Sequence, residues 1–542
     1  MGQHRIVAAA SRTATETSAR EAHARLVAGL RRALGDDTVL VETHISSVLL
    51  AGPAAYKLKK PVSLGFLDFT TLAARKQYCE LELALNRRTA PQLYLDVLPV
   101  TGSLAAPKLG GTGEVLDYAV KMRRFEAEDS FDRLLARGAL DASTVDALAD
   151  RVAAFHAAIE IAPADSPFGT PQAVLGDALD NFVHIEGLGP PGASLEALRR
   201  LRRWTESNGD ALRATFIARK KDGFVRECHG DLHLGNIARV DGAPTPFDCI
   251  EFNEEFRWID VMSEIAFTVM DFVDRGAPAF GWRFLNRALE SSGDYAGVAL
   301  LRFYLVYRAM VRAKVALIRA RQPEADARVR SGALADFAHH LADAAGFAAS
   351  RPPVLILTGG VSGSGKTTLA QSLLESLGAL RLRSDVERKR LHGLDATARS
   401  GSALDADLYS AQATRATYAR LAELAELLLP TGFPVIADAT FLHAADRKSF
   451  VRLARAAGAR AILLWCDAPM EILRERIATR AAAGRDASEA TLDVLTRQLE
   501  SLEPPKPDAD TVYCDSSDPE SVVEACREIA ERCAVAASAN AR

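Results

Sequence analysis

A glycine-rich stretch in the second half of the chain carries the residue types that bind phosphate. It reads GVSGSGKTT and fits the spacing GxxxxGK followed by Ser or Thr. Glycines let a loop curl so that several backbone N–H groups point at one anion, and a following helix N-terminus adds positive partial charge. The lysine can then reach the outer phosphates of a nucleotide, and the next hydroxyl can hold Mg²⁺. The pattern predicts an ATP site made by Gly360, Ser362, Gly363, Ser364, Gly365, Lys366, Thr367 and Thr368, with Thr367 also as a metal ligand.

The elements on both sides of this loop predict the geometry that the site requires. Residues Val354–Thr358 are apolar or β-branched and predict a short buried strand before the loop. After the loop, Leu369 and Leu373 recur at helical spacing, and Gly378 is suited to end that helix. A glycine-rich turn that merely joins a strand to a helix is the alternative, and the complete motif in this context disfavours it.

A second set of polar residues lies in the middle of the chain, where HGDLHLGN is followed by PFDCIE. Asp231 could accept the proton of an attacking hydroxyl, while Asn236 and Asp248 could supply the oxygen ligands that Mg²⁺ prefers. His229 and His233 predict no zinc site, because no thiolate or third histidine stands at ligand spacing. A plain polar turn is the alternative, but Asp248 ends a hydrophobic segment, as a metal-binding position of this type requires.

A lysine and a glutamate in the N-terminal part are candidates for an ion pair that holds phosphate. Lys57 stands in a strand-like apolar run, and Glu82 lies on a helix predicted from Thr70 or Thr71 to Arg88. A lysine in such a strand usually extends to solvent, but it can instead hold the α- and β-phosphates of a nucleotide. Each residue taken alone is more typical of a surface position.

These motifs together resemble a known family. HGDLHLGN with PFDCIEF looks like the aminoglycoside phosphotransferase and choline kinase-like family. YKLKKPVSLGFLDF with CELELALNRR resembles a bacterial subgroup in which such a domain is fused to a P-loop ATP-binding domain, and the resemblance covers about residues 35–530. It implies an ion pair of Lys57 and Glu82, a catalytic base at Asp231, metal ligands at Asn236 and Asp248, and a bracing role for Asp260. The chain departs from the kinase pattern in one place, because LAGP stands where a GxGxxG loop would cover the phosphates.

The segments after the glycine loop resemble P-loop kinases of the polynucleotide kinase-like and chloramphenicol phosphotransferase-like kind. In these kinases an Asp after the second strand activates the acceptor hydroxyl, and Asp385 with Arg388 resembles that catalytic arrangement. Asp438 ends a further predicted strand and is suited to Mg²⁺ or substrate, although a strand-end turn is as good an interpretation. Four arginines resemble the lid that closes over transferring phosphates, with the last two predicted to bind the nucleotide: Arg474, Arg476, Arg480 and Arg485.

Length and composition restrict the function classes. A chain of 542 residues predicts two to four domains, and 48% hydrophobic with 25% charged residues is typical of a soluble globular protein without a membrane partner. The net charge of −4 argues against a nucleic-acid partner. Seven cysteines form no CxxC pair, which predicts reduced thiols in the cytoplasm. Acidic residues recur from Glu251 to Asp274 and could receive a polycationic substrate, but solvated helix faces carry such runs more often.

We therefore predict two phosphotransferase-type domains. Residues 1–345 would form an α+β protein-kinase-like domain related to aminoglycoside phosphotransferases. Residues 346–542 would form an α/β P-loop domain with a parallel sheet and a helical lid. The expected activity is transfer of the γ-phosphate of ATP, with Mg²⁺, to a hydroxyl of a small molecule, at one site in each domain. Two alternatives stay open: a nucleotide-responsive regulatory protein in which one domain senses ATP, and a 5′-hydroxyl nucleic-acid end kinase supported by the basic run at 381–390.

Overall fold

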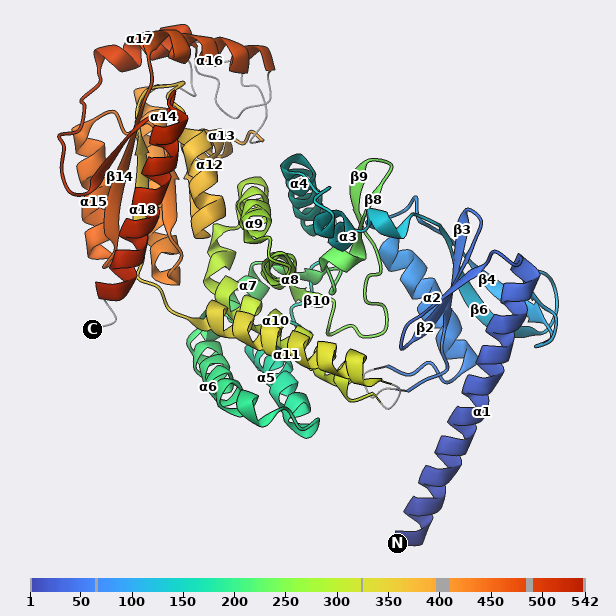
Figure 1. Ribbon diagram of the computed structural model, residues 1–542. Helices are drawn as coiled ribbons and strands as arrows, with labels where there is room; N and C mark the ends of the chain where they lie inside the picture. The colour runs from blue at the N-terminus through green and yellow to red at the C-terminus, as the bar shows by residue number, and fades with distance from the viewer. Residues whose placement is uncertain (1, 64–66, 323–324, 396–409, 484–490, 540–542) are drawn as a thin grey trace. The chain divides into compact units, whose positions relative to one another are not determined.

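The computed structural model of the protein describes residues 2–63, 67–322, 325–395, 410–483 and 491–539 (Figure 1). The chain divides into two compact units, and each unit is assembled from segments that are far apart in sequence. The first unit consists of Met1–Ala147, Ala158–Gly169 and Lys220–Glu264, and the second of Leu148–Ala157, Thr170–Arg219 and Ile265–Arg542.

A six-stranded antiparallel sheet in the order β1-β2-β3-β6-β4-β5 is the centre of the first unit. Its strands are β1 (Val39–Glu42), β2 (Ser46–Ala51), β3 (Ala54–Lys59), β4 (Tyr94–Gly102), β5 (Pro107–Leu109) and β6 (Val115–Arg123). Helix α1 (Gly2–Leu34) and helix α2 (Leu72–Asn86) belong to the same unit. The predicted N-cap of α2 is confirmed, since the Thr71 side chain accepts a hydrogen bond from the Ala74 amide.

The two helices cover opposite faces of this sheet. Leu30 of α1 packs in one core cluster with Leu58 and Ala119, whereas Cys79 of α2 packs in another with Val120. Successive side chains of a strand point to opposite faces. Strand β3 therefore turns Leu58 toward α1 and both of its neighbouring lysines toward α2, which decides where the ion pair of the candidate site forms.

Two short strand pairs carry the polar motif of the first unit. β7 (Val225–Glu227) pairs with β10 (Trp258–Asp260), and β8 (Ile237–Val240) pairs with β9 (Ala243–Pro246), both antiparallel. HGDLHLGN joins β7 to β8, and Asp248 follows β9, so the hairpin brings the two ends of the motif together. Helix α3 (Phe131–Ala136) and the first turns of α4 (Ala142–Ala158) complete the helices of this unit.

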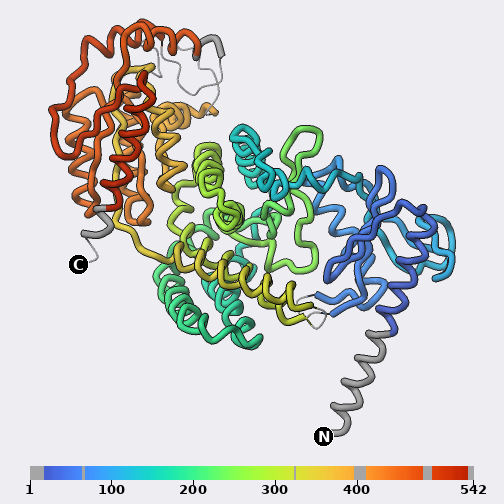
Figure 2. The backbone as a smooth tube through the Cα atoms, viewed as in Figure 1, coloured from blue at the N-terminus to red at the C-terminus, as the bar shows by residue number. Residues whose placement is uncertain are grey.

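Several helices of the second unit precede its sheet. They are α5 (Pro171–Gly187), α6 (Leu195–Ala211), α7 (Arg213–Lys221, whose last residues belong to the first unit), α8 (Val261–Asp274), α9 (Pro278–Ser292), α10 (Val298–Ala320) and α11 (Ala327–Ala348). Helices α10 and α11 run side by side (Figures 1 and 2).

The second unit also contains a five-stranded parallel sheet in the order β12-β13-β11-β14-β15. Its strands are β11 (Val354–Gly359), β12 (Leu380–Arg383), β13 (Val435–Asp438), β14 (Arg460–Asp467) and β15 (Thr511–Asp515). Its helices are α12 (Lys366–Leu377), α13 (Ser384–Leu391), α14 (Ala411–Leu428), α15 (Ala444–Ala456), α16 (Met470–Ala483), α17 (Leu492–Glu500) and α18 (Pro519–Ala539). Ligands of such sheets bind beyond the carboxyl ends of the strands, where the strand order reverses. Here that place is the end of β11, which lies between β13 and β14.

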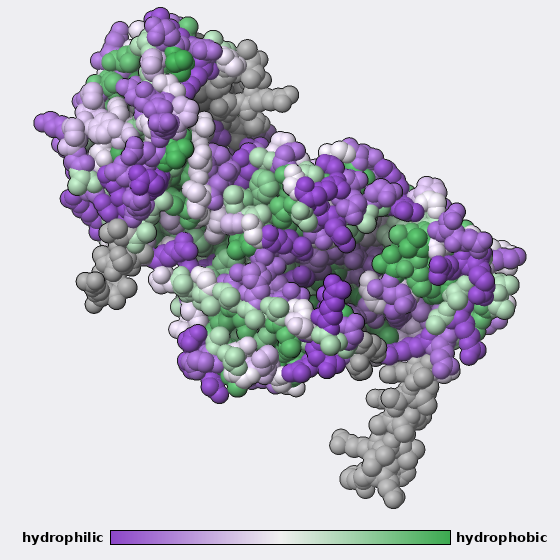
Figure 3. Space-filling model, viewed as in Figure 1, coloured by the Kyte–Doolittle hydropathy of each residue, from purple (hydrophilic) through white to green (hydrophobic). Residues whose placement is uncertain are grey.

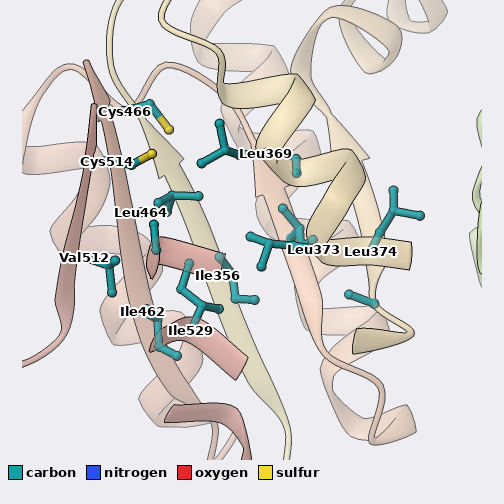
Figure 4. Close-up of a cluster of buried hydrophobic side chains, with 14 of the residues drawn as sticks. Ile356, Leu369, Leu373, Leu374, Ile462, Leu464, Cys466, Val512, Cys514 and Ile529 are labelled. Atoms are coloured by element: carbon teal, nitrogen blue, oxygen red, sulfur yellow. The ribbon is translucent and has the colours of Figure 1, made fainter. Parts of the chain in front are cut away.

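Buried apolar side chains fix the glycine loop to this sheet. All six residues of β11 are buried, as expected for a central strand of a parallel sheet. Leu373 of α12 and Ile529 of α18 pack with Ile356 and Leu464 of the strands (Figure 4). The predicted end of α12 is confirmed, because Gly378 adopts the left-handed conformation with φ of 68°.

The exposed surface is mixed in character. Hydrophilic and hydrophobic residues interleave over the face shown in Figure 3. Within the described parts of the chain, no helix has the length and apolar character needed to cross a membrane. The seven cysteines are free thiols.

Candidate functional site

The loop between β11 and α12 has a backbone that only glycine permits at its two ends. Gly360 has φ of +127°, and a Cβ there would lie 2.1 Å from the Cys466 carbonyl oxygen. Gly365 has φ of +81° and precedes the first residue of α12. Because L-residues rarely adopt such angles, both glycines are required for the loop to wrap around the helix N-terminus. The loop thereby has the geometry that holds an anion.

Lys366 and Thr367 begin α12 at the end of this loop. Lys366 is 9% exposed, and its Nζ donates to the Val361 carbonyl oxygen at 2.7 Å. The Thr367 side chain hydrogen-bonds the carboxylate of Asp438, which ends the neighbouring strand β13. Burial raises the pKa of Asp438, although the charges of nearby cations act in the opposite direction. The hydroxyl and the carboxylate form the kind of hard oxygen pair that suits Mg²⁺.

Asp385 lies on the far side of the same pocket. It is the second residue of α13, and Arg388 donates from Nη1 to its Oδ1 at 3.1 Å. The pocket has a volume of about 530 Å³. Its lining includes most of the residues predicted for this site: Ser362, Gly363, Gly365, Lys366, Thr367, Thr368, Asp385, Arg388 and Asp438. Gly360 and Ser364 are buried in the base of the loop.

One of the four arginines predicted for the lid lines the pocket. Arg476 of α16 lines the pocket and donates to the Gly363 carbonyl oxygen at 3.2 Å and to Ser516 at 2.7 Å. Arg474 is exposed. The Arg480 side chain and the whole of Arg485 lie outside the described residues.

Helix α17 supplies two lining residues that the sequence did not indicate. Arg497 and Gln498 both line the pocket, and the Ser362 amide donates to Gln498 Oε1 at 2.7 Å. This contact joins residues 136 positions apart, so no local spacing could have pointed to it. The glycine loop is therefore in direct contact with helix α17.

In the first unit, the loop between β7 and β8 is held by buried groups. Gly230 has φ of +87°, a Cβ there would lie 2.6 Å from the Phe256 carbonyl oxygen, and its amide donates to the buried Glu264 at 2.7 Å. His229 donates from Nε2 to the Phe247 carbonyl oxygen at 2.8 Å, and its Nδ1 accepts from the Asp231 amide at 3.4 Å. Burial lowers the pKa of His229, which favours this neutral form. His229 thus orients the backbone of the loop.

Three of the predicted residues converge on this loop. Asn236 donates from Nδ2 to Asp231 Oδ2 at 3.0 Å, and the Asp248 amide donates to the Tyr94 hydroxyl at 3.1 Å. Asp248 has φ of +62°, an uncommon conformation for a residue other than glycine. Such backbone persists where neighbouring contacts determine it, and it concentrates at functional sites.

The predicted ion pair forms and belongs to a larger network. Lys57 Nζ lies 2.8 Å from Glu82 Oε1 and 2.5 Å from Asp248 Oδ1. Lys59 Nζ lies 2.7 Å from Glu82 Oε2 and also pairs with Glu251. Glu82 is therefore shared by two lysines, and it is completely buried.

Electrostatics keep this network charged. Burial alone would raise the pKa of Glu82, but the charges of Lys57 and Lys59 outweigh it and lower the pKa to about 2. Burial alone would lower the pKa of Lys57, but Asp248 and Glu82 hold it well above its ordinary value. The ammonium group of Lys57 therefore stays protonated throughout the physiological pH range.

Lys59 and Glu251 were missed as partners at the sequence level. The signal was present for Lys59, because residues two apart on a strand share a face and Lys57 had been singled out. Glu251 was counted in an acidic run, but Glu251, Glu264 and Asp271 are buried, and each has a partner inside its own unit: Lys59, the Gly230 amide and Arg275. Burial removes these three carboxylates from any surface for a polycation. Asp260 accepts a hydrogen bond from the Met262 amide at the start of α8.

Two family profiles match successive parts of the chain. The profile of the phosphotransferase enzyme family matches residues 70–301, and a profile described as an AAA domain matches residues 355–505. An uncharacterized protein of Mycobacterium tuberculosis is 32% identical over 447 residues, which is 82% of this chain and 87% of the relative. A protein of Mycobacterium bovis with the same description matches to the same extent. The aligned region of 447 residues is longer than either matched segment, so the similarity extends over both of them.

The chain belongs to this family of fused proteins. It joins a phosphotransferase domain, matched at 70–301, to a P-loop domain, matched at 355–505. Kinase-type domains of both classes indicate phosphotransferase activity, and families of this kind generally use ATP and Mg²⁺.

Solved structures align with each domain at low identity. A choline/ethanolamine kinase family protein from Mesorhizobium loti aligns with 60% of this chain and 98% of its own, at 13% identity and a TM-score of 0.36. A gluconokinase from Sinorhizobium meliloti 1021 aligns with 34% of this chain and 96% of its own, at 23% identity and a TM-score of 0.24. Membership of the family rests on the profiles and the mycobacterial relatives rather than on these structures.

Proposed function

We propose that the protein is an ATP-dependent phosphotransferase that moves the γ-phosphate of ATP to a hydroxyl group of a small molecule. The observation that supports this most strongly is that Lys366, Thr367, Asp438 and Asp385 line one pocket of about 530 Å³. Pockets for metabolites and cofactors usually measure about 300–1,000 Å³. Phosphate-binding, metal-binding and proton-accepting groups therefore meet in a space of suitable size.

Each group has a role in this proposal. The loop amides and Lys366 bind the phosphates, while Thr367 and Asp438 hold Mg²⁺, whose charge neutralises the phosphate oxygens. Asp385, held by Arg388, accepts the proton of the acceptor hydroxyl. The hydroxyl oxygen forms a bond to the γ-phosphorus as the bond to the β,γ-bridging oxygen breaks, and ADP leaves. We assign Arg480 and Arg485 to the nucleotide on the resemblance alone.

The acceptor in this proposal is a small molecule rather than a nucleic acid. Arg497 and Gln498 of α17, and Ser501 just after it, line the pocket together with the glycine loop. The net charge of −4 gives the chain no general attraction for a polyanion. A small hydroxylated metabolite fits both facts.

We propose a second site of the same type in the first unit. Lys57, oriented by Glu82, would bind nucleotide phosphates, Asn236 and Asp248 would hold Mg²⁺, and Asp231 would accept the proton of the acceptor. The donor set fits the metal, because a carboxylate and an amide supply hard oxygen atoms. The protein would then be bifunctional, with a kinase-like domain at 1–345 and a P-loop domain at 346–542. Its seven free thiols suit the reducing cytoplasm, where we place it.

An ATP-consumption screen tests the proposal. The full chain is incubated with ATP, Mg²⁺ and a panel of hydroxylated metabolites, aminoglycosides and 5′-hydroxyl oligonucleotides. Asp231→Ala, Lys366→Ala and the double variant are assayed beside it. Arg527→Ala, at an exposed position of α18, is the matched control. We expect acceptor-dependent consumption that Lys366→Ala removes for one class of acceptor, that Asp231→Ala removes for another, and that the control retains.

Other outcomes would favour the alternatives. If ATP binds in a Lys366-dependent manner but no acceptor stimulates its consumption, the nucleotide-responsive regulatory function gains support. If only oligonucleotides with a 5′-hydroxyl stimulate consumption, the protein is an end kinase. Consumption that persists in the double variant would contradict both site assignments.

A further inference from the structure

Helix α9 reaches the edge strand of the parallel sheet, although the two belong to different matched segments of the chain. The phosphotransferase match at 70–301 includes α9, the P-loop match at 355–505 includes β12, and both elements lie in the second compact unit. Asn286 donates from Nδ2 to the Ala379 carbonyl oxygen at 2.9 Å and accepts at Oδ1 from the Arg381 amide at 2.7 Å. A single buried amide thereby satisfies backbone groups that an edge strand leaves unpaired.

Glu290, further along α9, binds the side chains of the same strand. Its Oε1 accepts from Arg381 Nε at 3.0 Å and from Arg381 Nη2 at 2.7 Å, and its Oε2 lies 3.6 Å from Arg383 Nη1. Glu290 is 2% exposed. Burial alone would raise its pKa, but the charges of Arg381 and Arg383 outweigh that effect and lower the pKa. The carboxylate therefore stays ionised and holds both arginines.

Glu290 is also connected to the helix that carries the proposed base. Arg390 of α13 donates from Nη2 to the Glu290 carbonyl oxygen and pairs through Nη1 with Glu387 of the same helix. Asp385 lies between these anchors, two residues after Arg383 and five residues before Arg390. Arg383 itself lines the pocket. Contacts from α9 thus hold the chain on both sides of Asp385.

Apolar packing keeps α9 in this position. Trp282 packs against the core cluster between the sheet and α12, and a Cβ at Gly378 would lie 2.7 Å from its indole ring. Arg283 pairs with Glu375 of α12 at 2.9 Å. The contact combines a buried aromatic anchor with ion pairs and backbone hydrogen bonds, which is how specific interfaces are built.

We propose that Asn286 and Glu290 are positioning residues for the P-loop site: α9 holds β12 and α13 so that Asp385 and Arg388 face the pocket. Helix α9, from the phosphotransferase segment, then supports the part of the P-loop site that contains Asp385 and Arg388. The glycine loop would bind phosphate without this support. The proposal rests on the proposed function for its effect on turnover, but the support of α13 can be measured without any activity.

Glu290→Gln in the full chain tests the proposal, because it keeps the shape of the side chain and removes the charge. Asp150→Asn is the control, since it breaks an ion pair of the same helix, with Arg287 at 2.7 Å, that does not reach β12, α12 or α13. Three quantities are measured: amide hydrogen exchange in residues 379–391, ATP affinity, and Lys366-dependent turnover with an acceptor from the screen. We expect Glu290→Gln to raise exchange and lower kcat by about 10- to 100-fold, the effect of losing a charged hydrogen bond. ATP affinity should stay within about two-fold, and the control should change none of the three.

A double-variant test separates a positioning role from a merely structural one. If Glu290 acts through Arg381, the pair Glu290→Gln and Arg381→Gln should lower kcat no further than Arg381→Gln alone. Should Glu290→Gln fail to fold, Asn286→Ala takes its place, with raised exchange in the same peptides as the expected result.

The outcomes that would overturn the proposal are definite. Unchanged exchange in 379–391, or equal changes in Glu290→Gln and Asp150→Asn, would show that Glu290 does not hold α13. Raised exchange with unchanged kcat in an active protein would show that the support does not position Asp385. If the wild type has no Lys366-dependent turnover, the proposed function fails, and the exchange measurement still decides whether α9 holds α13.

Discussion

Replacing the buried Lys59 by methionine should strongly destabilise the first unit. Methionine is close to lysine in length and removes only the charge. The lysine is completely buried, pairs with Glu82 and Glu251, and lies 5.0 Å from the centroid of the Phe69 ring. Glu82 keeps Lys57 as a partner, but Glu251 would be left in the protein interior without a cation. Removing one member of a buried ion pair costs about 3–5 kcal/mol, because the remaining charge is uncompensated.

Native-state hydrogen exchange measures this loss where it should occur. If β3 and α2 exchange through opening of the first unit, 3–5 kcal/mol corresponds to roughly 10²- to 10⁴-fold faster exchange in their amides. Lys60→Met is the matched control. Lys60 pairs with Glu42 at 3.3 Å, but its side chain is 22% exposed and that of Glu42 is 57% exposed. An exposed pair of this kind contributes about 0–1 kcal/mol, so the control should change exchange by less than about five-fold.

The stability that Lys59→Met loses relative to the wild type should also depend on pH, and the direction can be predicted. Burial raises the pKa of Glu251 above its ordinary value of 4.5, and loss of Lys59 should raise it further. A carboxyl whose pKa is higher in the folded state is neutral in both states well below pH 4.5 and costs no stability there. The cost grows as the pH rises from the unfolded-state pKa to the folded-state pKa, and it is constant above that. The deficit of Lys59→Met relative to wild type should therefore be smaller at pH 5 than at pH 8. Equal exchange in Lys59→Met and Lys60→Met, or a deficit independent of pH, would refute the reasoning.

Two further predictions concern the chemistry. Asp385→Asn should leave ATP affinity near wild type and lower kcat of the P-loop site by roughly 10²–10⁴-fold, the range for losing a general base. Weaker MgATP binding would instead identify a metal ligand, and normal turnover would transfer the role to Asp438. Asp248→Asn, made in the Lys366→Ala background to silence the P-loop site, should remove Mg²⁺-dependent turnover while the protein stays folded, because a neutral amide binds magnesium poorly. Mg²⁺-dependent turnover that survives in this variant would count against Asp248 as a ligand, with circular dichroism as the check on folding.

Much of the fold was predictable because its signals are local. The strand Val354–Thr358 and the helix ending before Gly378 follow from short runs of apolar residues and one glycine, and both are observed as β11 and α12. Thr71 was one of two candidates for the N-cap of α2, and its side chain accepts from the Ala74 amide. These features depend on neighbours within a few residues, so local propensity and capping decide them.

The burial of Lys59 shows where local reasoning fails. A lysine in a short strand next to two other lysines suggests an exposed edge, and solvent is the usual place for its ammonium group. Burial becomes stable only when Glu82 and Glu251 approach from segments 23 and 192 residues away. The sequence contains all three residues but not the distances between them.

The sequence by itself determined the chemistry of the candidate sites, because each motif is a contiguous segment. The order glycine, lysine, threonine at 365–367 and the spacing of Asp231 and Asn236 place the residues that we propose for phosphate, metal and proton on short contiguous segments. Only the tertiary structure decided which distant groups support them: Gln498 on the glycine loop, Glu290 on β12, and Glu251 on Lys59. Such contacts form only after the order of the strands and the packing of the helices bring remote segments together. Their free energy depends on burial of the assembled charges, which no short stretch of sequence encodes.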